Sequence, residues 1–281
     1  MSEYLEKSKK YKGYHYSVLS HEMIHYLHDT TLKMLQIIIP IFDEYKIRYF
    51  ICGGTLLGAE TTGKFIPWDD DIDICILEDD YDTAIKHLIE LVPDWMFVQW
   101  FSTEPNYYHG WVKVRDKNSH VYPDCPIYEQ NGVWIDLYKL TLASKESVEY
   151  LIIKEHLDYL NRRYSVGDIS EDEKNKRISE NKLIEKLQSY VHKNNMDHSN
   201  NDITYIIWSA SKILVDAQWC FPRKLYRFED IDLYSFNNAD QYLTRHYGSD
   251  YTHIPPEEKR RVGINRIEYN DNRESQSVYE K

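Results

Sequence analysis

Apolar and polar residues alternate with two different periods along this chain. Between residues 21 and 45 apolar side chains recur near helical spacing, whereas between residues 71 and 77 carboxylates alternate with isoleucines at the two-residue spacing of a strand. Patterns of the first kind predict helices at 21–45, from 56 onward, and at 80–91, 147–164, 171–193, 203–215 and 238–247. Patterns of the second kind predict strands at 47–52, 71–77, 95–101, 110–115 and 133–140, and residues 118–132 are predicted to form a loop.

The predicted elements divide the chain into a core and several smaller parts. Strands and helices alternate in residues 20–143, which are predicted to form the core. Residues 144–219 look helical and predict a helical subdomain, and the aromatic-rich residues 220–268 are predicted to pack on the core. The polar segment 1–19 is predicted to be mobile, and the charged tail 269–281 to be disordered.

Composition limits the classes of protein that this chain can belong to. The chain has 281 residues, 25 of them tyrosine, which indicates a folded globular protein of one or two domains. Its net charge of −12 argues against a nucleic-acid partner, because sequence-independent binding needs Lys and Arg at the phosphates. Cys52 and Cys75 lie in apolar runs, so we expect reduced thiols in a cytosolic protein. We find no signal peptide or spanning segment, so the protein is expected to be soluble or peripheral.

The acidic strand carries the strongest chemical signal. In a strand, Asp69, Asp71 and Asp73 share one face, and two carboxylates about 5 Å apart repel each other by roughly 3 kcal/mol at an effective dielectric constant near 20. A divalent cation offsets that repulsion, and carboxylate oxygens favour Mg²⁺ or Mn²⁺. The alternative is a solvated acidic turn or a surface Ca²⁺ loop. The apolar residues 65–68 that precede the acids favour the metal site over an exposed turn.

Other segments supply candidate partners for such a site. Gly53 and Gly54 allow close backbone approach, and Thr55 is predicted to cap a helix whose N-terminus could hold phosphate. Asp136 is a single acid in an otherwise apolar strand, which makes it a natural third ligand, with a structural aspartate as the alternative.

Two groups of basic side chains are ambiguous. Lys113 and Arg115 point to the same side of a strand and could contact phosphate or form a solvated face of the sheet. His21, His25 and His28 share one helical face, and we interpret them as a solvated or partner-facing stripe rather than a metal site.

Four segments together resemble one family. The run 54–74 contains Gly-Thr-Leu-Leu-Gly and Phe-Ile-Pro-Trp-Asp-Asp-Asp-Ile-Asp, and it is similar to the LicD family of phosphocholine and fukutin-type sugar-phosphate transferases. The helix and strand before Gly53, the strand 133–140, and the block Tyr-Leu…Tyr-Gly…Pro-Pro-Glu-Glu-Lys-Arg within 238–260 resemble the same family. The similarity spans about residues 30–262.

The resemblance implies a fold, a cofactor and a reaction. The implied fold is α+β and nucleotidyltransferase-like, a small mixed sheet flanked by helices with a helical C-terminal subdomain. The implied reaction is transfer of a substituted phosphate from CDP-choline or a similar CDP-linked donor to a sugar hydroxyl of a glycan or glycolipid. It implies Mg²⁺ on Asp71, Asp73 and Asp136, with Asp136 also a candidate proton acceptor. The expected nucleotide- and phosphate-binding residues are Gly53, Gly54, Thr55, Lys64, Trp68, Lys113, Arg115, Lys259 and Arg260.

The chain also departs from the family. It has Thr61-Thr62 where relatives usually have Arg-His, and it lacks their usual histidine after Arg260. The lost cation moves the phosphate contact to Lys64, or indicates a different donor or reduced activity. The leading hypothesis is a phosphocholine-type transferase in the cytoplasm, acting at the inner face of the membrane. The alternatives are a DxD glycosyltransferase that uses a nucleotide sugar, and a catalytically silent module that binds a nucleotide or glycan.

Overall fold

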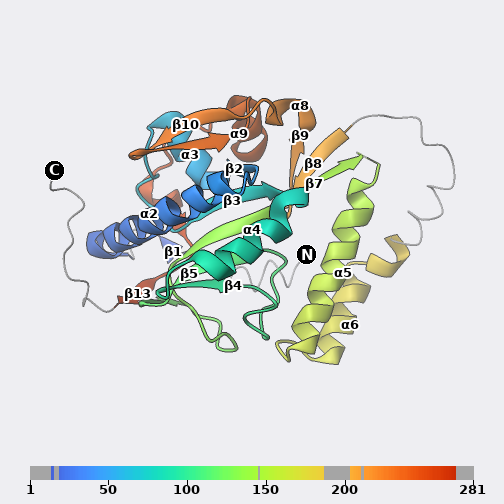
Figure 1. The fold of residues 1–281 in the computed structure, drawn as a ribbon. Helices are drawn as coiled ribbons and strands as arrows, with labels where there is room; N and C mark the ends of the chain where they lie inside the picture. The colour runs from blue at the N-terminus through green and yellow to red at the C-terminus, as the bar shows by residue number, and fades with distance from the viewer. Residues whose placement is uncertain (1–13, 16–18, 145, 187–202, 210–211, 270–281) are drawn as a thin grey trace.

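A mixed β-sheet forms the centre of the protein (Figure 1). The structure is a computed structural model that describes residues 14–15, 19–144, 146–186, 203–209 and 212–269. The sheet has the order β2-β3-β7-β5-β4, and β8 and β9 extend it from β7. The strands are β2 (Tyr49–Ile51), β3 (Ile72–Leu77), β4 (Met96–Gln99), β5 (Val112–Asp116), β7 (Trp134–Ser144), β8 (Ile203–Ile207) and β9 (Ile213–Asp216). The predicted α+β fold is confirmed.

The long strand β7 organises the sheet. One edge of β7 pairs with β3 in parallel, and the other edge pairs first with β5 and then with β8, both antiparallel. Residues Ile135 and Leu137 of β7, like Ile74 of β3, are fully buried. Strands buried on both faces tend to be rich in β-branched and other apolar residues, as these are. An acidic residue in such a strand is therefore unusual and indicates a specific role.

Two helices lie together across one side of the sheet. Helix α2 (His21–Glu44) and helix α4 (Glu78–Leu91) contact each other and strand β7, as Figure 1 shows. The hydroxyl of Ser20 accepts a hydrogen bond of 3.1 Å from the Met23 N–H and so caps the N-terminus of α2. Pro40 lies within α2.

A second group of elements packs beside β2 and β3. Helix α3 (Gly53–Thr61) contacts β3, helix α9 (Ala239–Tyr247) and strand β10 (Lys224–Phe228), while β11 (Ile231–Ser235) pairs with β10 and lies along β2. The short helix α8 (Ala217–Cys220) leads from β9 into this group. The N-terminus of α3 is thus enclosed by residues that come nearly 200 positions later in the chain.

The region 144–219 differs from the prediction. Helix α5 (Val148–Ser165) forms as expected. Helix α6 (Glu171–Glu180) ends earlier than the predicted helix 171–193, and the residues of that prediction beyond 186 lie outside the described residues. The predicted helix 203–215 is wrong, because this segment forms strands β8 and β9. Ile206 and Val215 are buried there, and β-branched side chains favour a strand that packs on the edge of β7.

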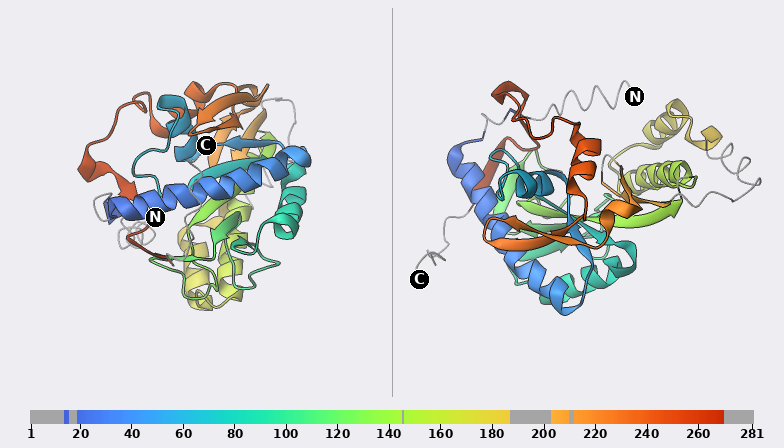
Figure 2. Two further views of the ribbon diagram at one scale, coloured as in Figure 1. Left: turned by 60° about the vertical axis from the view of Figure 1, so that its left-hand side comes forward. Right: turned by 90° about the horizontal axis from the view of Figure 1, so that it is seen from above.

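The C-terminal part of the chain returns to the start of the fold, as Figure 2 shows. Strand β12 (Arg261–Val262), which follows the 3₁₀ helix η2 (Glu257–Lys259), pairs with β1 (Tyr14–His15). Strand β13 (Arg266–Tyr269) pairs with β6 (Ser119–Tyr122), so the predicted loop 118–132 contains a strand whose partner is distant in sequence. Of the segments predicted to be mobile (1–19) or disordered (269–281), the structure describes only residues 14–15, 19 and 269.

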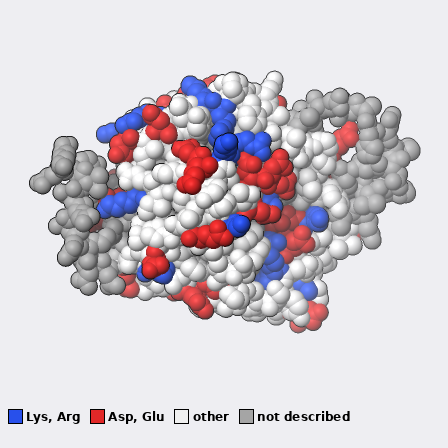
Figure 3. All heavy atoms as spheres, in the orientation of Figure 1, with Lys and Arg blue, Asp and Glu red and all other residues white. Residues whose placement is uncertain are grey.

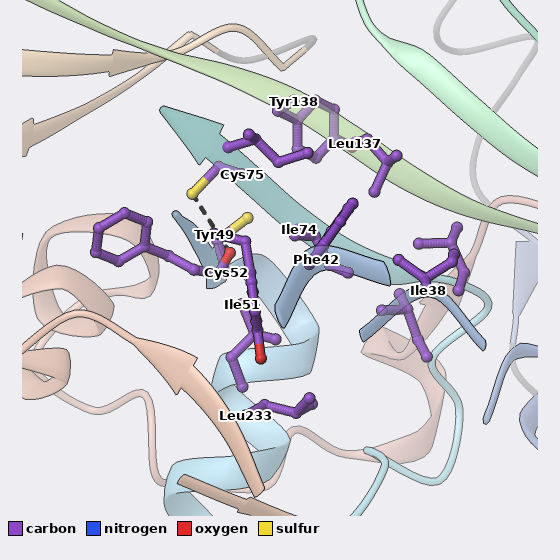
Figure 4. Packing of buried hydrophobic residues seen from close by; sticks show 14 of the residues in the cluster. Ile38, Phe42, Tyr49, Ile51, Cys52, Ile74, Cys75, Leu137, Tyr138 and Leu233 are labelled. Carbon is purple, nitrogen blue, oxygen red and sulfur yellow. Dashed lines mark hydrogen bonds between the residues drawn. The ribbon is translucent and has the colours of Figure 1, made fainter. Parts of the chain in front are cut away.

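Apolar side chains from all these layers meet in one main core. Figure 4 shows Phe42, Ile74 and Leu137 packed around β2 and β3, with the Cys75 thiol donating a hydrogen bond of 3.5 Å to the Phe50 carbonyl. Cys52 and Cys75 are buried and free, which confirms the expected core thiols.

The surface shows both signs of charge. On the face drawn in Figure 3, Lys and Arg side chains are interspersed with Asp and Glu. Among the described residues, we find no helix with the length and apolar character needed to cross a bilayer.

Candidate active site

Three neighbouring strands bring charged side chains to one level of the central sheet. Asp73 of β3 lies opposite Asp136 of β7, and Lys113 of β5 lies opposite the same Asp136 from the other edge. Side chains that are level on adjacent strands point to the same face of the sheet. The sheet therefore places two carboxylates and one ammonium group in a row, from three segments that are far apart in the chain.

Further carboxylates come from the loop that enters β3. One oxygen each from Asp71, Asp73 and Asp136 lies within 4.8 Å of the other two, and the same holds for Asp69, Asp70 and Asp71. Asp71 belongs to both groups. Asp136 is buried, and the other four residues are partly buried. The three acids predicted to share a metal thus converge in space, while their binding of a metal remains a prediction.

Burial and mutual repulsion disfavour the ionised forms of this cluster. Burial, followed by the charge of Asp136, raises the pKa of Asp73 to about 7. Burial also raises the pKa of Asp70 to about 6. Burial and then the charge of Asp73 raise the pKa of both Asp69 and Asp71 well above the usual range. A bound divalent cation would reverse this preference, because an opposite charge nearby favours the ionised carboxylate.

The two glycines of the Gly-Gly-Thr turn give these acids room. Gly53 has a φ of 55°, and a methyl group there would lie 2.1 Å from Oδ2 of Asp73. At Gly54 a methyl group would lie 2.3 Å from Oδ2 of Asp69. The turn therefore lets the carboxylates approach the N-terminus of α3, where the positive end of the helix favours negative charge. That it also contacts a substrate phosphate remains a prediction.

The contacts of Thr55 correct its predicted role. The N-cap of α3 is Cys52, and no side chain caps this helix. The Thr55 hydroxyl instead accepts a hydrogen bond of 2.9 Å from the backbone N–H of Asp73. The Gly53 N–H donates to the hydroxyl of Tyr242, 3.0 Å away on α9. Thr55 and Tyr242 thus fix the backbone on both sides of the contact between Gly53 and Asp73.

Asp136 has the most hydrogen-bonded carboxylate of the cluster. Its Oδ1 accepts hydrogen bonds from Nε1 of Trp111 at 2.8 Å and from Nζ of Lys113 at 2.6 Å. Its Oδ2 accepts from Nε1 of Trp134 at 3.0 Å and from the Tyr138 hydroxyl at 3.2 Å. These four donors satisfy both oxygens of a carboxylate that is only 4 % exposed.

The structure separates the roles of the two basic residues on β5. Both are buried, so the alternative of a solvated sheet face is wrong. Both charged groups lie near the Trp134 ring, with Lys113 Nζ 4.4 Å and Arg115 Cζ 5.4 Å from its centroid. Arg115 donates to the Gln99 side chain at 2.6 Å and to the Gly132 carbonyl at 2.7 Å. Lys113 is the cation of this pair that contacts the acid cluster.

The other predicted phosphate-binding residues lie around the acidic loop or apart from it. Arg260 stacks on Trp68, with its Cζ 4.4 Å from the ring centroid, and the Gly263 N–H bonds to the Asp70 carboxylate. The C-terminal segment therefore lies directly against the acidic loop. Lys64 and Lys259 are exposed, and among the described residues neither has a hydrogen bond or ion pair with the cluster.

One of the three helix histidines supports the acidic loop. Nε2 of His28 lies 2.9 Å from the Asp69 carbonyl, and its ring stacks on Phe65 with the centroids 4.1 Å apart. Burial lowers the pKa of His28, which favours its neutral form. His21 and His25 are exposed, which agrees with the predicted solvated stripe. His28 does not belong to that stripe, because its side chain contacts the acidic loop.

Sequence reasoning missed several side chains of the site. Trp134 and Tyr138 lie two residues on either side of Asp136 in β7, so the alternation of a strand could have placed them beside it. Trp111 lies just before β5 and Tyr242 lies on α9, and no local pattern links them to the acids. Burial, followed by the charges of Asp73 and Asp69, raises the pKa of Tyr247 on α9.

Comparisons with known proteins agree with this geometry. Residues 46–167 match the family described as LicD/FKTN/FKRP, nucleotidyltransferase domain. The chain is 26 % identical over 257 residues to the lipopolysaccharide cholinephosphotransferase LicD of Haemophilus influenzae. This alignment covers 81 % of this chain and 90 % of that protein.

A shorter similarity links the chain to mammalian proteins. The ribitol 5-phosphate transferases FKRP of mouse and human are both 29 % identical to it over 109 residues, which is 35 % of this chain. That alignment covers 22 % of the mouse and 21 % of the human protein, so it concerns one part of them only. The matched domain contains the acidic loop, β3, β5 and β7, and the similarity to LicD extends over most of both chains. Residues 46–167 are thus similar to the nucleotidyltransferase domain of the LicD family, and the chain as a whole is similar to a cholinephosphotransferase.

Proposed function

We propose that the protein transfers phosphocholine, or a related substituted phosphate, from a CDP-linked donor to a sugar hydroxyl of a glycan or glycolipid in a Mg²⁺-dependent reaction. The observation that carries the proposal is the convergence of Asp71, Asp73 and Asp136 within 4.8 Å. The names of the relatives support the reaction class, since one is a cholinephosphotransferase and the other a ribitol 5-phosphate transferase. Both names describe transfer of a phosphate that carries an alcohol.

The donor atoms of the cluster suit a magnesium ion. All candidate ligands are carboxylate oxygens, the hard ligands that Mg²⁺ and Mn²⁺ prefer. Burial, and after it the charges of neighbouring carboxylates, raise the pKa of Asp71 and Asp73, and a bound divalent cation would oppose this effect. When bound, the ion would neutralise the charge that develops on the donor phosphates as the nucleotide leaves.

Residues of the chain would hold and orient the two substrates. Asp71 and Asp73 would bind the metal, with Asp136 as the third carboxylate. Lys113 would add a positive charge beside them, 2.6 Å from Asp136. The acceptor oxygen would form a bond to the phosphorus atom that carries choline while the bond from this atom to the bridging oxygen of cytidine monophosphate breaks, and the hydroxyl proton would pass to water. Four hydrogen bonds occupy both oxygens of Asp136, so it can serve as the third ligand only if one of its donors leaves, and we assign it no separate part in proton transfer.

We place this reaction in the cytoplasm, at the inner face of the membrane, where nucleotide-linked donors and lipid-linked glycans can meet. Contact with the membrane would then be peripheral.

A donor screen tests the proposal. The protein is incubated with Mg²⁺, a glycolipid extract and one of CDP-choline, CDP-ribitol or UDP-glucose, and released nucleotide is measured. Each donor's protection against thermal unfolding is recorded in parallel. We expect cytidine monophosphate from a CDP-linked donor, and none with Asp71→Asn. Release of UDP would instead support a glycosyltransferase, and protection by a nucleotide without turnover would support a silent binding module.

A further inference from the structure

The carboxylate of Asp136 has no free position for a metal ion. A carboxylate offers about four lone-pair sites. Trp111 and Lys113 occupy Oδ1, while Trp134 and Tyr138 occupy Oδ2. Oxygens of Asp71, Asp73 and Asp136 nevertheless lie close enough to share one cation. For Asp136 to become a metal ligand, one of its four hydrogen-bond donors must therefore leave.

Lys113 is the donor that can leave most readily. The indole of Trp111 and the phenol of Tyr138 are rigid rings with centroids 5.7 Å apart, and the ring of Trp134 contacts two cations, Lys113 and Arg115. Lys113 carries its ammonium group on a flexible four-carbon stem. It is also the donor with a full positive charge, so it is the one that a divalent cation on the same carboxylate would repel.

We propose that Lys113 holds the place of the metal on Asp136 in the metal-free protein, and that it transfers to a phosphate oxygen of the nucleotide donor when the metal binds. This inference rests on the proposed function. It assigns Lys113 two successive partners, first the Asp136 carboxylate and then the substrate phosphate.

The surroundings of Lys113 support the second partner. Its side chain is 10 % exposed, and its ammonium group has three N–H bonds. Among the described residues it has one hydrogen-bond acceptor, Oδ1 of Asp136, and the face of Trp134 lies 4.4 Å from Nζ. A buried ammonium group that loses its carboxylate needs another anion, because an unpaired buried charge is costly. In the proposed reaction the donor phosphates are the anions brought beside the metal.

The proposal predicts opposite effects of one substitution on two ligands. Lys113→Met removes the competing charge but keeps an apolar stem of similar length. Without nucleotide, it should bind Mg²⁺ about tenfold more tightly than the wild type, because the ion no longer displaces a cation from Asp136. At saturating Mg²⁺, it should bind CDP-choline about tenfold more weakly, because a charged hydrogen bond to phosphate is lost.

Isothermal titration of the full chain measures both affinities. Lys139→Met is the matched control, since Lys139 lies on β7 but pairs with Glu78, 3.7 Å away, and both affinities should stay within about twofold of the wild type. Lys113→Gln is the second variant, because it removes the charge yet can still donate a hydrogen bond to Asp136. If Lys113→Met fails to fold, the glutamine variant decides the outcome.

The outcomes separate this inference from the proposed function. Tighter Mg²⁺ binding together with weaker CDP-choline binding supports the exchange of partners. Unchanged or weaker Mg²⁺ binding by the variants refutes it, since a purely structural lysine would stabilise the site for both ligands. A wild-type protein that binds CDP-choline but no Mg²⁺ refutes both the inference and the metal site. A wild type that binds Mg²⁺ but none of the screened nucleotides refutes the proposed donor class and the second half of the inference.

Discussion

The substitution Gly53→Ala tests how the turn positions the acid cluster. The added methyl group would lie 2.1 Å from Oδ2 of Asp73, so the carboxylate must move by about 1.3 Å to reach an ordinary contact of 3.4 Å. Gly53 also has a φ of 55°, and an L-residue in this left-handed region costs about 1–2 kcal/mol. A displacement of about 1 Å at a catalytic group lowers the rate by roughly a hundredfold. We therefore expect both lower stability and a turnover about a hundredfold lower.

Gly167→Ala is the matched control for this prediction. Gly167 has a φ of 74°, and a methyl group there would meet no atom within 4 Å. It therefore carries the backbone cost without any displacement of a carboxylate. Urea unfolding gives the stability of both variants, and nucleotide release at saturating donor gives their turnover. If Gly53→Ala lost no more turnover than Gly167→Ala, the claim that this glycine positions Asp73 would be wrong.

Three further predictions follow from the same contacts. Asp71→Asn should abolish turnover and leave the thermal midpoint within a few degrees of the wild type, measured by nucleotide release and thermal melting; retained activity would contradict the metal assignment. The pKa of Asp73 is raised to about 7, so its protonated form contributes stability at low pH that is lost as the pH rises through this value. With a chelator present, the thermal midpoint should therefore decrease between about pH 5 and about pH 8, and the decrease should be larger in the wild type than in Asp73→Asn. Excess Mg²⁺ should make this decrease smaller. Tyr242→Phe leaves the buried Gly53 N–H without its hydrogen-bond acceptor and should lower the free energy of unfolding in urea by about 1–3 kcal/mol. The control Tyr251→Phe loses an exposed hydrogen bond to Asp240 and should lower it by less than about 0.5 kcal/mol.

The acidic strand illustrates what the sequence could predict. Alternation of carboxylates and isoleucines in residues 71–77 gave both the strand and the face that carries Asp71 and Asp73. The single acid in β7 pointed to Asp136 for a related reason, since a lone carboxylate among apolar residues needs a partner. Local periodicity was sufficient here, because these strands are buried and their pattern is strict.

Features that depend on distant partners could not be predicted in this way. The apolar residues of the segment 203–215 fit either period, and pairing with the edge of β7 makes them strands rather than the predicted helix. Strand β6 forms because β13 pairs with it from the other end of the chain.

The site shows the same limit. The sequence suggested phosphate contacts for Gly53 and Gly54, but their close neighbours in the structure are the carboxylates of Asp73 and Asp69. Nor could it show that Lys113 faces Asp136 rather than solvent, since this depends on the register of β5 against β7. Residue types were therefore more predictable than the contacts that define their roles.

The central claim is that Asp71 and Asp73 bind one divalent cation that the proposed reaction requires. Isothermal titration of Mg²⁺ into chelator-treated protein tests it most directly, with the wild type, Asp71→Asn and Asp73→Asn compared at the same pH. The account predicts a saturable binding event in the wild type that is lost in both variants. Absence of binding to the wild type, or equal binding by either variant, would contradict it.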